Sequence, residues 1–164
     1  MKKILILTIL IAAQCVAFAQ KVSGVASNKH DGDTFWLNKP DGTILKIRLA
    51  SIDAPELAQA YGKASRDFLK KLIDQKTVVV DVQEKDKYQR SVGVVFLNNE
   101  NINRSLVANG YAWHYLKYSR DSELSKIEND AKSKKKGLWR DEKPLPPWQY
   151  RAEKRAAQKI KMAA

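Results

Sequence analysis

The feature that most constrains this sequence is a series of short, strand-like segments separated by turn residues. Apolar and β-branched residues predict strands over residues 22–26, 34–37 and 43–52. The segments between them, His30-Asp31-Gly32-Asp33 and Pro40-Asp41-Gly42, contain the residue types that favour tight turns. Three consecutive strands with such short connections predict a β-meander.

The middle of the chain adds one helix and two more strands. Apolar residues recur with a period near 3.6 over residues 57–73, which predicts an amphipathic helix. Strands are predicted over residues 77–82 and 91–97, with a charged hairpin between them. Five short antiparallel strands with a helix between the third and the fourth predict an α+β fold, the five-stranded Greek-key β-barrel called the OB-fold.

The C-terminal part is predicted to be helical, with one extended interruption. Asn101 is a suitable N-cap for a helix that ends before Gly110, and a second helix is expected over residues 122–135, ending at Gly137. The prolines of residues 144–147 predict an extended strap, followed by a basic tail helix over residues 148–161. About three helices and a tail helix are therefore expected beside the barrel.

The first residues have the pattern of a Sec-type signal peptide. Lys2 and Lys3 precede an apolar run of about ten residues, which is too short to span a membrane, and Ala17-Phe18-Ala19 predicts cleavage after Ala19. A buried N-terminal helix and a lipoprotein signal ending at Cys15 are the alternatives. The predicted organisation is a signal peptide over 1–19, a barrel domain over 20–140, and a strap with a basic tail over 141–164. The protein is expected to be secreted or periplasmic, without stable membrane insertion, and monomeric.

Charge is distributed unevenly along the chain. The formal net charge is +12, yet residues 20–131 carry 17 basic and 15 acidic residues, while residues 132–161 carry 11 and 3. A basic balance favours a polyanionic partner. The tail is interpreted as a solvated segment that could also contact phosphates, and on either interpretation it need not touch the active site.

Two predicted strand ends carry acidic motifs, Asp31-Gly32-Asp33-Thr34 and Ile52-Asp53-Ala54-Pro55-Glu56. The sequence has no Cys or His cluster for a soft metal, so oxygen ligands predict Ca²⁺, Mg²⁺ or Mn²⁺. Arg48 lies on the strand before the second motif and can face the same opening, and Arg90 follows the charged hairpin. Carboxylates, a metal ion and two guanidinium groups form a site suited to a phosphodiester.

Each motif alone has a structural explanation. Asp-Gly is an ordinary turn sequence, and Pro55-Glu56 could simply begin a helix. Arg48 alone would be a solvated strand residue. The combination favours a functional site.

Together these residues resemble the staphylococcal nuclease (thermonuclease) family over residues 22–140. The matching segments follow one another in the family's order and are these: Asp31-Gly32-Asp33-Thr34, Arg48-Leu49, Ile52-Asp53-Ala54-Pro55-Glu56, Tyr61-Gly62 with Ala64, Asp86-Lys87-Tyr88-Gln89-Arg90, Gly110 with Ala112-Trp113, and Gly137-Leu138-Trp139.

The resemblance implies roles for the acidic residues. Asp33 and Asp53 match the carboxylates that bind a single Ca²⁺, with the backbone carbonyl of Ala54 as a further ligand and Asp31 near the site. Glu56 matches the residue assigned as general base for the attacking water.

The resemblance also implies how the substrate is held. Arg48 and Arg90 match the arginines that bind the scissile phosphate and stabilise the transition state. Lys87 and Tyr88 match positions near the terminal phosphate of the nucleotide. Tyr118 aligns with a substrate-binding tyrosine if no gap intervenes, although an aromatic cluster after a helix is usually core.

Together with the resemblance, these residues predict an exported, Ca²⁺-dependent endonuclease that is nonspecific for the sugar. The resemblance implies cleavage of DNA and RNA to 3′-phosphate products. The alternatives are a non-catalytic nucleic-acid-binding module of the same family and a basic exported protein that binds anionic surface polymers.

Two departures from the family's pattern affect the site. Gln89 stands where glycine is usual, so a turn that requires a positive φ would strain the loop presenting Arg90. The segment from residue 57 to residue 60 is shorter than the mobile lysine-rich loop of the best-known member.

Overall fold

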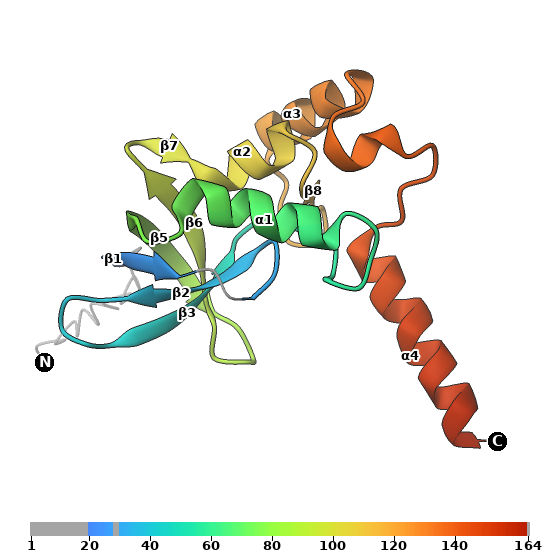
Figure 1. The fold of residues 1–164 in the computed structure, drawn as a ribbon, viewed down its shortest axis with the longest axis horizontal. Helices are drawn as coiled ribbons and strands as arrows, with labels where there is room; N and C mark the ends of the chain where they lie inside the picture. Colours follow the sequence, from blue (N-terminus) through green and yellow to red (C-terminus); the bar gives the residue numbers. More distant parts are fainter. Residues whose placement is uncertain (1–19, 28–29, 164) are drawn as a thin grey trace, which may run out of the picture.

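The computed structural model describes residues 20–27 and 30–163. The predicted signal peptide and Cys15 lie outside the described residues, so the expectation of export stays a prediction. The described part of the chain is a mixed α+β structure, in which a β-barrel carries helices against one side and a last helix extends away from it (Figure 1).

The barrel is built from five strands, as the sequence predicts. Its strands are β1 (Gln20–Ser27), β2 (Thr34–Asn38), β3 (Ile44–Leu49), β5 (Thr77–Lys85) and β6 (Ser91–Leu97). They pair in the order β3-β2-β1-β5-β6, and a parallel pairing between β3 and β6 closes the ring. The OB-fold prediction is therefore confirmed.

Alternation along the strands fills the inside of this barrel. On β2, Phe35 and Leu37 are fully buried, whereas Trp36 between them is exposed. On β5, Val78 and Val80 are buried on either side of the exposed Val79. Successive side chains point to opposite faces of a strand, which is why the apolar positions meet in one core.

Two very short strands position the second acidic motif. In β4 (Ile52–Asp53), Ile52 pairs with His114 and Asp53 with Trp113 of β8 (Trp113–His114). The buried His114 is held by the hydroxyls of Ser119 and Ser125. β8 and β7 (Glu100–Asn101) were not predicted, because two residues are too few to show a pattern. The single strand predicted over residues 43–52 is divided into β3 and β4 by a turn in which Ser51 adopts φ +65°.

Helix α1 (Gly62–Ile73) begins five residues later than predicted. The prediction of a helix from residue 57 is wrong because residues 56–62 form successive turns, in which Glu56 accepts from Gln59 N–H and Gln59 accepts from Gly62 N–H. A Cβ at Gly62 would lie 1.9 Å from the carbonyl oxygen of Glu56. Glycine therefore allows the Glu56 loop to pack directly on the start of the helix.

The next two helices agree with the prediction. Helix α2 (Ile102–Ala108) is capped by Asn101, whose side chain accepts from Arg104 N–H. Helix α3 (Ser122–Ser133) is two residues shorter than expected. Gly110 adopts a positive φ after α2, as expected of a residue that follows a helix. After α3 this place is taken by Lys135, at φ +48°, and Gly137 begins the next helix.

A 3₁₀ helix, η1 (Gly137–Arg140), leads into the strap and then into α4 (Pro147–Ala163). The predicted tail helix is thus confirmed, with Pro147 at its first position, where its missing N–H is not needed. From residue 152 to residue 162 every residue of α4 is exposed. Among the described helices, none is long and apolar enough to cross a membrane.

Candidate active site

The structure brings the two acidic motifs and Arg48 to one point at the strand ends. Asp33 directly precedes β2 and Asp53 ends β4, and the two side chains are almost completely buried, with 7% and 2% exposure. Arg48 Nη2 lies 3.2 Å from Asp33 Oδ2 and 3.0 Å from Asp53 Oδ1. One guanidinium therefore bridges the two carboxylates, as the alternation of β3 predicts.

The Asp33 carboxylate is fixed by the neighbouring backbone. Its Oδ2 accepts a hydrogen bond from Ala54 N–H at 2.7 Å, and its own N–H donates to Asp31 Oδ1 at 3.2 Å. The other oxygen of Asp31 lies 3.0 Å from His30 Nδ1. The contacts of Asp31 therefore stabilise the turn that presents Asp33. Burial raises the pKa of Asp33 to about 7, against the lowering effect of Arg48.

Glu56 lies on the turn that packs against Gly62. Its side chain is more exposed than those of the two aspartates, at 37%. Its backbone N–H donates to Gln59 Oε1 at 3.2 Å. Glu56 is therefore held beside Asp53 by short-range turns, with a carboxylate that solvent can reach.

The hairpin between β5 and β6 carries the second arginine. Asp86 organises it: Oδ1 accepts from the N–H groups of Tyr88 and Arg90, and Oδ2 lies 2.7 Å from Arg90 Nε. The Arg90 guanidinium lies over the ring of the exposed Tyr88, and Lys87 lies near the same ring. The structure thus groups Lys87, Tyr88 and Arg90 on the hairpin. The ion pair that it shows for Arg90 is with Asp86.

Gln89 adopts φ +62°, so the hairpin does require the left-handed conformation that glycine favours. We expect Gln89→Gly to stabilise the protein by up to about 1 kcal/mol, because it relieves this backbone strain. Part of that stabilisation is offset, because glycine also increases the conformational entropy of the unfolded chain. Urea unfolding of the two proteins measures the difference. The control is Asn38→Gly at the end of β2, where the backbone does not have a positive φ, and this change should destabilise the protein. A lower stability of Gln89→Gly would contradict the strain.

The aromatic candidate Tyr118 lies on the loop after β8. It is 68% exposed and packs edge-on against Tyr115, at a centroid distance of 4.9 Å. Tyr115 is stacked face-to-face on Trp148 of α4, at 5.3 Å with 4° between the ring planes. Tyr118 is thus accessible, whereas one face of Tyr115 is covered by the tail helix.

Arg151 of α4 is the site residue that sequence reasoning missed. Its Nη2 lies 2.7 Å from Asp53 Oδ2, and its Nη1 lies 2.8 Å from Glu56 Oε1. Partial burial lowers the pKa of Arg151, but the hydrogen bonds to Asp53 and Glu56 outweigh it and raise the pKa above its ordinary value. The expectation that the tail need not touch the active site is wrong. Arg151 belongs to no motif. The only sequence signal was that it lies in a basic segment, which did not indicate a contact with the acidic residues.

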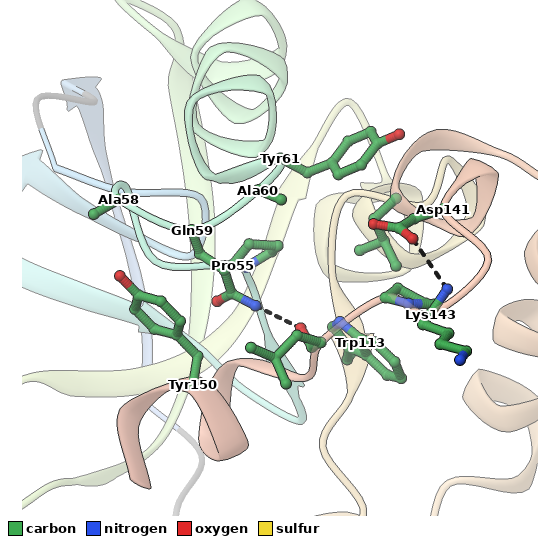
Figure 2. A pocket seen from close by; sticks show the side chains of 12 residues that line it. Pro55, Ala58, Gln59, Ala60, Tyr61, Trp113, Asp141, Lys143 and Tyr150 are labelled. Atoms are coloured by element: carbon green, nitrogen blue, oxygen red, sulfur yellow. Dashed lines mark hydrogen bonds between the residues drawn. The ribbon is translucent and has the colours of Figure 1, made fainter. Parts of the chain in front are cut away.

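A cavity of about 190 Å³ separates the loop before α1 from the strap (Figure 2). Pro55, Gln59 and Tyr61 line one side, and Leu145 and Tyr150 line the other. The Gln59 amide donates to the carbonyl oxygen of Leu145 across it. None of the residues Asp33, Arg48, Asp53 and Glu56 lines this cavity, so it lies beside the acidic site and not over it.

The acidic site suits a hard cation in its donor chemistry. Asp33 and Asp53 offer carboxylate oxygens within 3.2 Å of one common nitrogen, and a cation would offset the cost of burying Asp33 in its charged form. In residues 20–27 and 30–163, no group of three or more His, Cys, Asp or Glu side chains is arranged to hold a metal. An ion here would thus take its remaining ligands from main-chain oxygens and water.

Fold and site together define an OB-fold protein with a carboxylate–guanidinium centre at its strand ends, and comparisons with known proteins place it more narrowly. Residues 46–141 match the family model described as Staphylococcal nuclease homologue. The chain therefore belongs to the staphylococcal nuclease family.

Several relatives of this chain carry nuclease names. An uncharacterized endonuclease of Haemophilus influenzae is 41% identical over 133 residues, which is 81% of this chain and 72% of the relative. An uncharacterized endonuclease of Escherichia coli is 41% identical over 125 residues, covering 76% of this chain and 81% of the relative. The staphylococcal-like nuclease CAN1 of Arabidopsis thaliana is 40% identical over 110 residues, covering 67% of this chain and 34% of the relative.

Proposed function

We propose that this protein is an endonuclease that hydrolyses phosphodiester bonds of DNA and RNA. The observation that carries the proposal is the convergence of Asp33, Arg48 and Asp53, with Glu56 beside them. Family membership and the nuclease names of the relatives support it. The side chains assigned here to the substrate include Arg48, Arg90 and Lys87, whose positive charge suits the nucleic-acid backbone, so binding through backbone charge and weak sequence preference are expected.

In this proposal Glu56 removes a proton from the attacking water as general base. Arg48 and Arg90 donate hydrogen bonds to the phosphate oxygens, on which charge accumulates in the transition state. Water adds to phosphorus and the bond to the 5′ oxygen breaks, which leaves a 3′-phosphate. Lys87 and Tyr88, on the same hairpin as Arg90, and Tyr118 are assigned to substrate binding.

The proposed metal ion is a single Ca²⁺. Asp33 and Asp53 would hold it, together with the backbone carbonyl of Ala54, because all three supply the oxygen ligands that Ca²⁺ prefers. When bound, the ion would polarise the phosphate and help to position the water.

The proposed location is outside the cytoplasm, with residues 1–19 removed as a signal peptide and the mature protein acting as a monomer. The charge pattern of residues 1–19 and the small residues before position 20 support it. N-terminal sequencing of the exported protein would test the cleavage after Ala19.

The direct test is incubation of the mature protein with plasmid DNA and with RNA, in Ca²⁺ or in an excess of chelator. We expect cleavage of both substrates with Ca²⁺, loss of cleavage with the chelator, and 3′-phosphate ends on the products. Binding of nucleic acid without Ca²⁺-stimulated cleavage would contradict the enzyme and indicate the non-catalytic binding module instead.

A further inference from the structure

The guanidinium of Arg151 uses the same oxygen atoms that the proposed cation needs. Asp53 Oδ2 accepts from Arg151 Nη2 at 2.7 Å, and Asp53 Oδ1 accepts from Arg151 Nη1 at 3.2 Å and from Arg48 Nη2 at 3.0 Å. Both oxygens of Asp53 therefore have guanidinium partners. Arg151 Nη1 also holds Glu56 Oε1 at 2.8 Å, so one side chain engages a proposed metal ligand and the proposed general base.

A guanidinium and a divalent cation cannot share this position without a large electrostatic cost. A Ca²⁺ ion coordinates carboxylate oxygens at about 2.3–2.6 Å, closer than Arg151 approaches. Two cations on the same carboxylate oxygens would repel each other strongly in a partly buried site. Binding of one is therefore expected to weaken binding of the other, by the same factor in both directions.

The segment that carries Arg151 is attached to the body at its beginning. Trp148 stacks on Tyr115 and packs edge-on against Trp113. Gln59 holds the strap through Leu145. Beyond Arg151 the helix is exposed throughout and projects away from the barrel (Figure 1). Displacement of Arg151 would hence disturb little of the hydrophobic core.

The same helix places further positive charge beside Glu56. A groove of about 330 Å³ has Glu56 and Leu57 on one wall, and Arg151, Lys154 and Arg155 of α4 on the other. Arg151 is hydrogen-bonded to Glu56 Oε1, so it engages one of the two oxygens that would accept the proton of the attacking water.

We propose that α4 is an autoinhibitory element in which Arg151 occupies the cation position between Asp53 and Glu56 until a divalent cation displaces it. The inference rests on the proposed function, since it concerns regulation of the same site. In the metal-free protein the helix closes the site, and an excess of Ca²⁺ opens it. Cleavage at low Ca²⁺ is limited by this exchange.

The test compares the wild type with Arg151→Gln, which removes the charge but keeps the helical propensity. Lys159→Gln is the matched control, because Lys159 is an exposed residue two turns further along α4. The affinity for Ca²⁺ is measured by calorimetric titration without nucleic acid. Arg151→Gln should bind Ca²⁺ at least about tenfold more tightly than the wild type, because the ion no longer has to break charge-assisted hydrogen bonds of Arg151. Lys159→Gln should bind as the wild type does.

A second measurement follows the helix itself. In the wild type, saturating Ca²⁺ should speed amide hydrogen exchange over residues 147–155, and in Arg151→Gln these amides should exchange fast with or without Ca²⁺. Arg151→Lys, which keeps the charge but loses the two-pronged contact, should bind Ca²⁺ with intermediate affinity. Matching thermal unfolding midpoints would show that the variants are folded.

These measurements distinguish a failure of the proposed autoinhibition by α4 from a failure of the proposed endonuclease activity. Equal Ca²⁺ affinities for all variants, with Ca²⁺-dependent cleavage intact, would overturn the autoinhibition and leave the enzyme. Unchanged exchange in the wild type on adding Ca²⁺ would likewise overturn the displacement of α4. Absence of Ca²⁺ binding and of cleavage in every variant would overturn the proposed function and, with it, the competition.

Discussion

Replacing Glu56 by glutamine should lower the cleavage rate at saturating Ca²⁺ by about 10²–10⁴-fold, the usual contribution of a positioned general base. The amide cannot accept a proton from water, but it fills the same volume as the carboxylate and its oxygen can still accept hydrogen bonds. Because Glu56 is partly exposed and lies on a turn, the fold should tolerate the change. Single-turnover cleavage of a short oligonucleotide measures the chemical step.

The control for this variant is Glu142→Gln, which removes one negative charge from an exposed position on the strap. It should cleave at the wild-type rate. If Glu56→Gln also retained the wild-type rate, another group would have to serve as base. A fall in substrate affinity with an unchanged rate of the chemical step would assign Glu56 to binding instead.

Arg48→Lys should lower cleavage by about 10²–10³-fold, the cost of losing one donor aimed at developing charge. Lysine keeps the positive charge between the buried Asp33 and Asp53, so the acids remain compensated. The lysine ammonium lacks the planar guanidinium group, whose several N–H donors can bind the two carboxylates and a phosphate oxygen at the same time. The loss should appear mainly in kcat, since the interaction strengthens as charge builds up in the transition state.

The matched control is Arg140→Lys, at an exposed position at the end of η1. Thermal unfolding of both variants would separate an effect on the reaction from one on stability. An Arg48→Lys enzyme within threefold of the wild type would show that a point charge is sufficient at this position, and that the fork has no special role.

Much of the barrel could be predicted from local sequence. The alternation at Phe35, Leu37, Val78 and Val80 fixes which face of each strand is buried, and the structure shows these four side chains in the core. The signals at Asn101 and Gly110 were likewise sufficient for the helix between them, because caps act within one turn of the helix end.

Other features could not be predicted, because they depend on contacts distant in sequence. The helix expected from residue 57 begins only at Gly62, since a periodic apolar pattern does not reveal that the Glu56 carbonyl packs against that glycine. The pairing of Asp53 with Trp113 joins segments 60 residues apart, and each strand has only two residues.

The sequence by itself determined the barrel and the acid and arginine residues that converge at its strand ends, because alternation and short motifs encode which side chains share a face. Only the tertiary structure decided what else enters that site. Arg151 reaches Asp53 across 98 residues of chain, after a strap whose path no local pattern specifies. The sequence showed a basic tail, and the packing of Trp148 on Tyr115 is what directs one of its charges onto the carboxylates.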